Sequence, residues 1–194
     1  MTEFSNLITK QIYNEIECNE IFNHLNTIEV EYRKEYKGMY GRMMCVPRGQ
    51  ASFTLNNNIH YNYKVSGGSP PNYLMNNKLK EITEKVNKIL NTNFNTILMN
   101  VYKNGDDCIS FHKDKETGWV KNTGFATLSF GAERDFCLKK VDIGENKNIL
   151  HKAGLIIYMP YPMNDYFLHA VPKRKKVTET RISLTFREIE EKSQ

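Results

Sequence analysis

The second half of the chain is built of short strand-like segments with no helical pattern between them. From residue 94 onward, apolar residues fall in eight segments bounded by turn residues such as Asn104-Gly105, Gly131 and Gly144. The segments cover residues 96–102, 109–112, 125–130, 136–140, 148–151, 155–159, 167–170 and 180–187. Many short strands at this spacing predict a sandwich or a jelly roll. Segment 155–159 is apolar on both faces, which is typical of a central strand.

The first half mixes helical and strand patterns. Residues 5–28 have a weakly amphipathic helical pattern with a break at Cys18-Asn19, where Asn19 is a candidate N-cap. Strands are predicted at residues 30–32, 41–46, 51–55 and 61–65, and a helix at residues 76–91. We find no repeat or linker. We therefore predict one α+β domain over residues 1–194, with the N-terminal helices and strands packed outside a jelly roll formed by residues 94–187.

Charge and cysteine content narrow the cellular setting. The net charge of +5 favours a polyanionic partner such as nucleic acid. The four cysteines are scattered without a Cys-x-x-Cys pair, so we expect reduced thiols and no structural zinc. Acidic residues interrupt the first 25 positions, and no apolar run reaches about 18 residues. We expect a nuclear or cytoplasmic protein with no secretion signal and no membrane span, and we expect it to be a monomer.

His112 and Asp114 stand two residues apart at the end of a predicted strand. Strand side chains alternate between faces, so both project from one surface. A second histidine would complete a two-histidine, one-carboxylate set, which leaves open positions on a non-haem iron(II) ion. Among the five histidines, His169 is the best candidate because it lies in an apolar strand, whereas His151 is next to Lys152, a poor setting for a cation. Taken alone, a His-x-Asp pair is more often a surface feature and a lone strand histidine is more often part of the core.

The last predicted strand has one apolar face and one polar face. The polar face carries Arg181, Ser183, Thr185 and Arg187. Two arginines among small residues indicate an anionic small molecule inside the barrel, because arginine binds carboxylates in a bidentate manner. A solvated strand face is the alternative. Asn100 and Tyr102 share one face of an earlier strand and are candidates for further polar contacts.

Together these pieces resemble the AlkB family, the iron- and 2-oxoglutarate-dependent dioxygenases that repair alkylated nucleic acid. The resemblance extends from about residue 40 to residue 187 and rests on Asn100-Val-Tyr102, His112-Lys-Asp114, Ser129-Phe-Gly-Ala-Glu-Arg-Asp-Phe136, His169 and Arg181-Ile-Ser-Leu-Thr-Phe-Arg187. Val46-Pro-Arg-Gly-Gln-Ala51 and Leu168-His-Ala-Val-Pro-Lys-Arg-Lys-Lys176 are similar to the eukaryotic DNA-repair members. The resemblance implies a double-stranded β-helix core, preceded by a helix and substrate-recognition hairpins within residues 1–66.

The resemblance also implies the site and its cofactors. It implies that His112, Asp114 and His169 bind Fe²⁺. It further implies that 2-oxoglutarate is held by Asn100, Tyr102, Arg181, Ser183 and Arg187, with Arg181 on the distal carboxylate and Arg187 near the carboxylate on the metal side. Ser183 stands where the family usually has asparagine, and a hydroxyl offers one donor where an amide offers two.

The implied reaction is oxidative demethylation of N-alkylated bases, of the 1-methyladenine and 3-methylcytosine type, in DNA or RNA. With O₂ as oxidant, it would release formaldehyde, succinate and CO₂. A methyl group on a base-pairing nitrogen weakens the pair, so such a base is easier to extrude from a duplex.

Further residues are implied to bind the nucleic acid. Tyr63 is similar in place to a base-pocket aromatic, Val65 stands where the nearest relatives have a second stacking phenylalanine, and Glu116 is a candidate for the exocyclic amine of the base. A solvated loop acid is the alternative for Glu116. Tyr40 lies in a hairpin similar to one that some members press into the duplex, where it would fill the gap left by the flipped base.

Phosphate contacts are expected from Arg42 and Arg48 and from the basic run Lys173, Arg174, Lys175 and Lys176. A solvated turn and a nuclear-localisation signal are alternatives for the basic run. Two other functions stay open for the chain as a whole. One is a catalytically silent nucleic-acid-binding module, and the other is a dioxygenase that acts on protein or on a small molecule.

Overall fold

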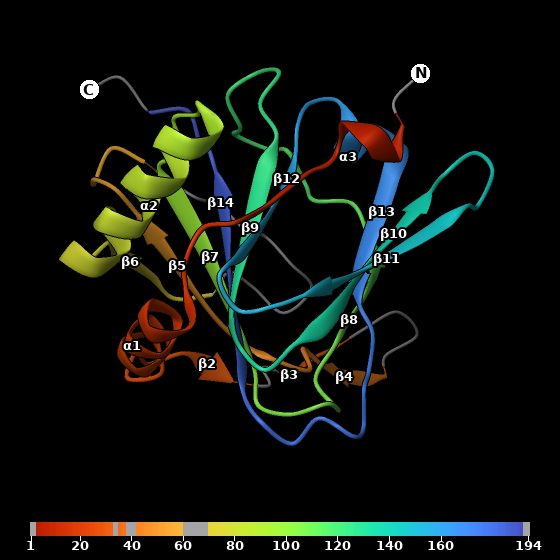
Figure 1. Cartoon of the computed structure of the whole chain (residues 1–194), viewed down its shortest axis with the longest axis horizontal. Coiled ribbons are helices and arrows are strands. Elements are labelled where there is room, and N and C mark those ends of the chain that lie inside the picture. The colour runs from red at the N-terminus through yellow and green to blue at the C-terminus, as the bar shows by residue number, and fades with distance from the viewer. Residues whose placement is uncertain (1–2, 33–34, 38–41, 60–69, 192–194) are drawn as a thin grey trace.

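Two β-sheets face each other, and two helices cover the outer face of the larger sheet (Figure 1). The computed structural model describes residues 3–32, 35–37, 42–59 and 70–191. The described residues include three helices, α1 (Glu15–Leu25), α2 (Asn77–Leu90) and the single turn α3 (Met163–Tyr166), and a 3₁₀ turn, η1, that covers Phe4–Asn6. Within the described residues, no helix is long and apolar enough to cross a membrane.

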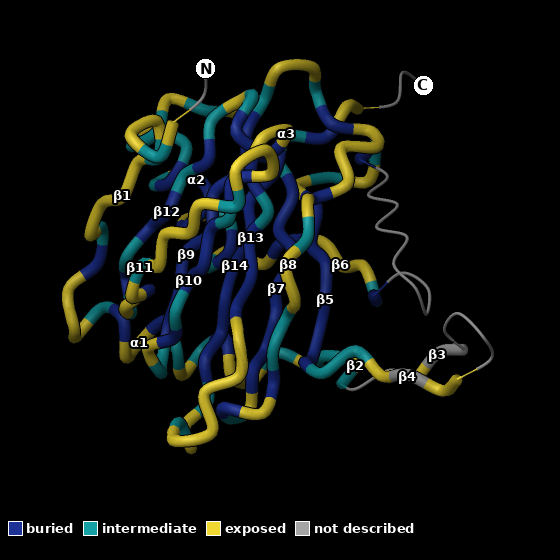
Figure 2. Tube along the Cα trace, turned by 90° about the vertical axis from the view of Figure 1, so that its right-hand side faces the viewer, coloured by how far each residue is buried: buried dark blue, intermediate teal, exposed yellow. Residues whose placement is uncertain are grey.

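The large sheet has eight strands in the order β1-β12-β9-β14-β7-β5-β2, with β6 paired in parallel to β5. Their bounds are β1 (Ile8–Gln11), β2 (Glu31–Tyr32), β5 (Gly49–Thr54), β6 (Asn72–Leu74), β7 (Thr96–Tyr102), β9 (Phe125–Gly131), β12 (Leu155–Met159) and β14 (Arg181–Arg187). The small sheet has the order β11-β10-β13-β8, from β8 (Ile109–His112), β10 (Arg134–Lys140), β11 (Asn146–His151) and β13 (Phe167–Val171). The remaining strands, β3 (Glu35–Lys37) and β4 (Met43–Cys45), form a hairpin that stands out from the barrel in Figure 2. This is the predicted α+β double-stranded β-helix.

Strand β14 separates two hydrophobic cores. Its apolar residues Ile182, Leu184 and Phe186 pack with buried residues of both helices, among them Leu25 of α1 and Leu79 of α2. The second core lies between the two sheets and includes Leu98, Phe125, Phe136 and Phe167. Because side chains alternate along a strand, the polar residues of β14 are turned away from the helices and into the space between the sheets. Figure 2 shows the central strands as buried along most of their length.

Helix α2 follows its predicted pattern closely. Leu79, Ile82 and Val86 recur at helical spacing and are buried against the large sheet. The side chain of Asn76 accepts a hydrogen bond from the backbone N–H of Leu79 and so caps the first turn. Asn91 ends the helix in the left-handed conformation, with φ at 54°.

The prediction for the N-terminal segment is wrong in two respects. Helix α1 is capped by Asn14, not Asn19, and Asn14 and Glu17 form a reciprocal capping box. Residues Ile8–Gln11 form β1, which pairs antiparallel with β12. Each residue of β1 is exposed, so no alternating apolar pattern marks it as a strand. Strand β1 forms because its backbone pairs with the backbone groups at the open edge of β12. A local sequence pattern does not contain that information.

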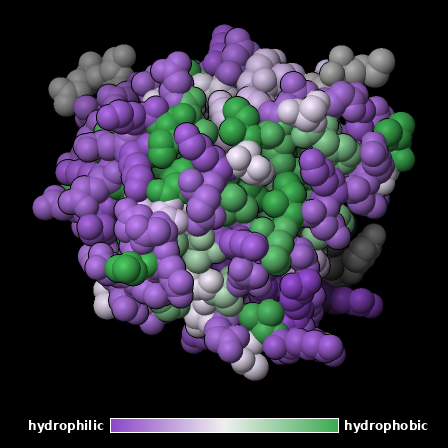
Figure 3. Space-filling model, viewed as in Figure 1, coloured by the Kyte–Doolittle hydropathy of each residue, from purple (hydrophilic) through white to green (hydrophobic). Residues whose placement is uncertain are grey.

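Strand positions from residue 94 onward agree with prediction to within two residues. Segment 155–159 is indeed internal to the sheet, since β12 pairs with β1 on one side and β9 on the other. The predicted strand at 61–65 and the first residue of the predicted strand at 41–46 lie outside the described residues. On the face seen in Figure 3, hydrophobic residues form a band between the regions of β12 and of β10 and β11, with hydrophilic residues on either side.

Gly131 offers a test of how tightly the end of β9 is packed. It has φ at +77°, and a Cβ built there would lie 2.4 Å from the Thr180 carbonyl oxygen and 2.6 Å from the Phe22 ring. Gly144 has a similar φ of +70°, but its Cβ would meet only Lys139, at 3.8 Å. We expect Gly131→Ala to lower the free energy of unfolding by about 2–4 kcal/mol and Gly144→Ala by about 1 kcal/mol. Urea titration of both variants measures this, and equal losses would contradict the packing argument.

Candidate active site

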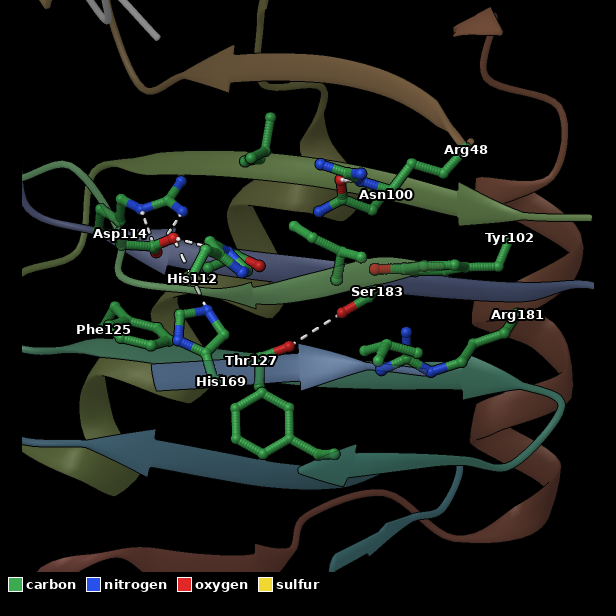
Figure 4. Close-up of a pocket in the computed structure, with 16 residues that line it drawn as sticks. Arg48, Asn100, Tyr102, His112, Asp114, Phe125, Thr127, His169, Arg181 and Ser183 are labelled. Atoms are coloured by element: carbon green, nitrogen blue, oxygen red, sulfur yellow. Dashed lines mark hydrogen bonds and ion pairs between the residues drawn. The ribbon is translucent and has the colours of Figure 1, made fainter. Parts of the chain in front are cut away.

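Three side chains carried by the β8–β13 pair of the small sheet and the residues after β8 converge at one end of the space between the sheets (Figure 4). His112 is the last residue of β8, Asp114 follows it, and His169 pairs with His112 across the two strands. One ligand atom of each lies within 4.8 Å of the others. The Asp114 Oδ1 atom is 3.5 Å from His112 Nε2 and 3.7 Å from His169 Nε2. This is the predicted two-histidine, one-carboxylate set.

Asp114 is held by an arginine from the opposite sheet. Arg187, the last residue of β14, donates from Nε to Asp114 Oδ2 at 3.2 Å and from Nη2 to the same oxygen. Oδ1 is therefore the oxygen that faces the histidines. Burial raises the pKa of the Asp114 carboxyl, but Arg187, a hydrogen bond from His112 and the two imidazoles outweigh it and hold the pKa well below its usual range. Asp114 is thus an anion at neutral pH, as a metal ligand must be.

The two histidines present Nε2 to the centre. His112 Nδ1 lies 2.9 Å from the Ser110 carbonyl oxygen, which fixes its ring and leaves Nε2 for a metal. His169 is packed against the Phe125 and Phe136 rings, at centroid distances of 5.0 and 5.6 Å. Burial, aided by the neighbouring His112, lowers the pKa of His169 to about 3. Two imidazoles and one carboxylate from one side are the donor set of non-haem iron(II) sites.

A buried cation occupies the other end of the same cavity. Arg181, the first residue of β14, is 1% exposed. Its Nη2 donates to His151 Nδ1 at 3.0 Å, whereas its Nε and Nη1 find no hydrogen-bond partner among the described residues. The Tyr102 ring lies 5.1 Å from its guanidinium carbon. A buried guanidinium with unpaired donors is costly, so this end of the cavity is suited to a carboxylate. Metal ligands at one end and a free guanidinium at the other fit a chelating acid with a second, distal carboxylate.

Comparison with known proteins agrees with this geometry. Residues 4–187 match the family profile of the 2OG-Fe(II) oxygenase superfamily. The chain is 31% identical over 192 residues to the DNA oxidative demethylase ALKBH2 of Bos taurus and of Homo sapiens, in each case over 92% of this chain. The chain belongs to the AlkB family of 2OG-Fe(II) oxygenases.

Further matches include a plant relative and two solved structures. The ALKBH2 protein of Arabidopsis thaliana is 34% identical over 77% of this chain. This chain spans 66% of the length of the bovine relative, 71% of the human one and 55% of the plant one. Among solved structures, OsALKBH1 matches with a TM-score of 0.61 at 14% identity, covering 94% of this chain and 98% of that one. A 2OG-Fe(II) oxygenase from Burkholderia pseudomallei matches with a TM-score of 0.58 at 12% identity, covering 95% and 85%. The solved structures support the fold.

The remaining predicted cosubstrate residues line the same cavity. Asn100, Tyr102 and Ser183 are all among its wall residues. The Asn100 side-chain oxygen accepts from Gln50 Nε2 at 2.9 Å, so its Nδ2 is the group available to a ligand. Ser183, which replaces the family's asparagine, bonds instead to Thr127, with 2.9 Å between the two hydroxyl oxygens.

Arg48 is placed differently from the prediction. It was expected to contact phosphate, but it is 6% exposed and lines the cavity. Its Nε donates to the Asn100 side-chain oxygen at 2.8 Å. The structure therefore corrects the expected surface role, because a guanidinium buried beside Asn100 cannot also lie on an external phosphate. Arg48 directly precedes β5.

The other predicted nucleic-acid residues fall into two groups. Those of the basic run, residues 173–176, and Arg42 are exposed, and Figure 1 shows the loop between β13 and β14 at the same end of the molecule as the β3–β4 hairpin. Within the run, Arg174 pairs with Asp135 at 2.9 Å. Tyr40, Tyr63 and Val65 lie outside the described residues. Glu116 is exposed and accepts a hydrogen bond from Asn164 at 2.8 Å. This bond ties it to the loop after β8 that carries Asp114, which we call the metal loop.

Sequence reasoning missed Asn164, which supports the metal loop. This buried residue of α3 accepts from the Asp114 backbone N–H at 3.0 Å and donates to the Asp114 carbonyl at 2.9 Å. It therefore fixes the backbone that carries the acidic ligand. Asparagine is not a ligand of such metal sites, and one that lies 50 residues from Asp114 gives no local signal in the sequence. Trp119 was also missed; its ring lies 5.6 Å from the guanidinium carbon of Arg187.

Removing the Asn164 side chain tests its part in metal binding. Asn164→Ala should raise the dissociation constant for Mn²⁺ by roughly tenfold, because a partner that orients a ligand typically contributes that much. Trp119 is the only tryptophan, so its fluorescence reports the titration. Asn148→Ala, at an exposed position of β11, serves as the matched control and should bind Mn²⁺ like the wild type. Equal affinity in all three proteins would show that the loop does not depend on Asn164.

The buried histidines predict how stability changes with pH in the metal-free protein. In the unfolded chain His169 takes up a proton near its ordinary pKa of 6.5, but in the folded chain only near 3. Burial likewise lowers the pKa of His151 well below 6.5. Between these values the unfolded state binds more protons, so stability falls as pH drops below about 6.5. Each histidine contributes a slope of up to about 1.4 kcal/mol per pH unit. Urea unfolding at pH 7.5, 6.5 and 5.5 measures this, and a flat profile would contradict it.

Proposed function

We propose that this chain is an oxidative demethylase of N-alkylated bases, of the 1-methyladenine and 3-methylcytosine type, in DNA or RNA. The observation that carries the proposal is one cavity with a metal-ligand triad at one end and the unpaired donors of buried Arg181 at the other. Relatives with the name DNA oxidative demethylase, at 31% identity over most of this chain, support the choice of substrate. The exposed basic run at residues 173–176 supports a phosphate backbone as partner.

The roles of the side chains follow from their positions. His112, Asp114 and His169 would hold the iron from one side, and Arg181 would bind the distal carboxylate of 2-oxoglutarate. Iron(II) with 2-oxoglutarate and O₂ supplies an oxidation in which the cosubstrate leaves as succinate and CO₂ and the methyl group of the base is hydroxylated. The hydroxymethyl group on nitrogen then departs as formaldehyde, which returns the unmodified base.

Other residues control the surroundings of that reaction. Arg187 keeps Asp114 ionised and aims one of its oxygens at the centre. Phe125 and Phe136 cover the His169 ring and keep water from that side of the site. Glu116 lies at the exposed rim of the metal loop, where it could accept from the exocyclic amine of a base. We expect the protein to act as a monomer in the nucleus or the cytoplasm.

Turnover on defined oligonucleotides tests the proposal. Protein loaded with Fe²⁺ and 2-oxoglutarate should release formaldehyde from oligonucleotides that contain 1-methyladenine or 3-methylcytosine. His112→Ala and Asp114→Ala should lower the rate at least a thousandfold, because each removes one of three ligands. His24→Ala, at a histidine of α1 outside the cavity, should keep wild-type turnover.

The substrate panel should include single- and double-stranded DNA and RNA, so that the nucleic acid is identified by rate. Iron content is measured on each protein. A wild-type protein with iron bound that turns over none of these substrates would rule out the proposed function. In that case, binding to the same oligonucleotides without consumption of 2-oxoglutarate would indicate a silent binding module.

A further inference from the structure

His151 makes two hydrogen bonds from a position with no exposed surface. It is the last residue of β11, at the turn into β12. Its Nε2 lies 2.9 Å from the Leu155 carbonyl oxygen, which can only accept, so Nε2 carries the proton. Its Nδ1 is then the unprotonated nitrogen and accepts from Arg181 Nη2 at 3.0 Å. The backbone of the β11–β12 turn thus selects the tautomer that can receive a hydrogen bond from Arg181.

Arg181 needs such a partner because few polar groups among the described residues hold its guanidinium; besides His151, Tyr102 is the polar side chain that acts on it. Its Nε and Nη1 have no partner, and Tyr102 meets it through the ring, at 5.1 Å. A second buried cation, Arg134, has its guanidinium carbon 5.8 Å from the centroid of the same Tyr102 ring and offers no acceptor. The bond to His151 uses Nη2 and leaves Nε and Nη1 without a partner among the described residues.

A neutral acceptor is the appropriate partner for this arginine. An aspartate or glutamate at the same place would neutralise the guanidinium and compete with an incoming carboxylate. An imidazole fixes the direction of the side chain and leaves its full charge for the ligand. The environment maintains this state, since burial and the nearby Arg181 both lower the pKa of His151.

We propose that His151 is a positioning residue that aims Arg181 at the distal carboxylate of 2-oxoglutarate and so sets the affinity of this chain for its cosubstrate. The inference rests on the proposed role of Arg181. His151 lies outside the metal site and outside the expected nucleic-acid surface. Its effect is therefore expected on the affinity for the dicarboxylate alone.

Three variants separate the two hydrogen bonds of His151. His151→Leu removes both, and His151→Gln can keep the donor to Leu155 while losing the acceptor for Arg181. His151→Asn places an oxygen near the position of Nδ1 and can keep the acceptor. We expect the dissociation constant for 2-oxoglutarate to rise roughly tenfold in the Leu and Gln variants and to return to within about threefold of wild type in the Asn variant. Calorimetric titration of Mn²⁺-loaded protein measures this without turnover.

A second ligand isolates the distal carboxylate. 2-Oxobutyrate has the chelating 2-oxo acid group but no distal carboxylate, so its affinity should be the same in wild type and in all three variants. The KM for 2-oxoglutarate should follow its dissociation constant, while kcat at saturating 2-oxoglutarate and the affinity for Mn²⁺ should stay at wild-type values. Thermal unfolding of each loaded variant shows whether the protein is folded at the assay temperature.

The possible results separate the proposed role of His151 from the proposed role of Arg181. Wild-type affinity for 2-oxoglutarate in His151→Leu would overturn the inference, and so would an equal loss for 2-oxobutyrate or for Mn²⁺, which would mark His151 as merely structural. Arg181→Gln tests the premise, because it should itself weaken 2-oxoglutarate and not 2-oxobutyrate. In that background, His151→Leu should cause no further loss. If Arg181→Gln binds 2-oxoglutarate like wild type, it is the proposed role of Arg181 that fails.

Discussion

The structure depends on two arginines whose charges are buried inside the barrel. Arg181 and Arg187 stand at the two ends of β14, and both are nearly inaccessible to water. Taking a guanidinium out of water costs several kcal/mol unless it is paired. The cause of their burial lies in the neighbouring residues of the strand. It follows from the apolar residues between them, which must face the helices and therefore turn every second residue of β14 into the barrel.

The two charges are satisfied in different ways, and the difference creates the site. Arg187 has a carboxylate partner in Asp114, so its pairing also orients a metal ligand and keeps that ligand ionised. Arg181 has only the neutral imidazole of His151, so its charge is left uncompensated by any hydrogen-bonded acid among the described residues. The cavity thus has a metal-chelating end and a cationic end, which is the complement of a 2-oxo acid with a second carboxylate. The same strand supplies Arg181 and Arg187, so the separation of the two arginines is fixed by the rise of β14.

The sequence predicts this arrangement where local pattern and side-chain chemistry coincide. The alternation in β14 predicts which residues face inward, and the spacing of His112 and Asp114 predicts two ligands on one surface. The supporting residues are not predictable in this way. Asn164 acts on Asp114 from 50 residues away, and Arg48 turns inward because of its contact with Asn100. In the sequence, the adjacent Lys152 makes His151 a poor candidate for a metal ligand. Yet adjacent residues of a strand point to opposite faces, so the exposed Lys152 says nothing about the buried position beside it.

Ser183 shows how the supporting residues matter for the cavity as a whole. An asparagine at this position would bring an amide into the cavity, but the Ser183 hydroxyl is directed to Thr127 on the neighbouring strand. The part of the wall beside Asn100, its partner across β14 and β7, is therefore satisfied within the protein and has fewer groups to offer a ligand. With fewer donors along the wall, the orientation of a dicarboxylate would depend more on its two ends, where the metal ligands and Arg181 lie. An Arg181 guanidinium held in one direction by a buried, neutral histidine then contributes more to binding the dicarboxylate than it would in a cavity lined with amides. The serine at position 183 and the histidine at position 151 are in this way parts of one arrangement.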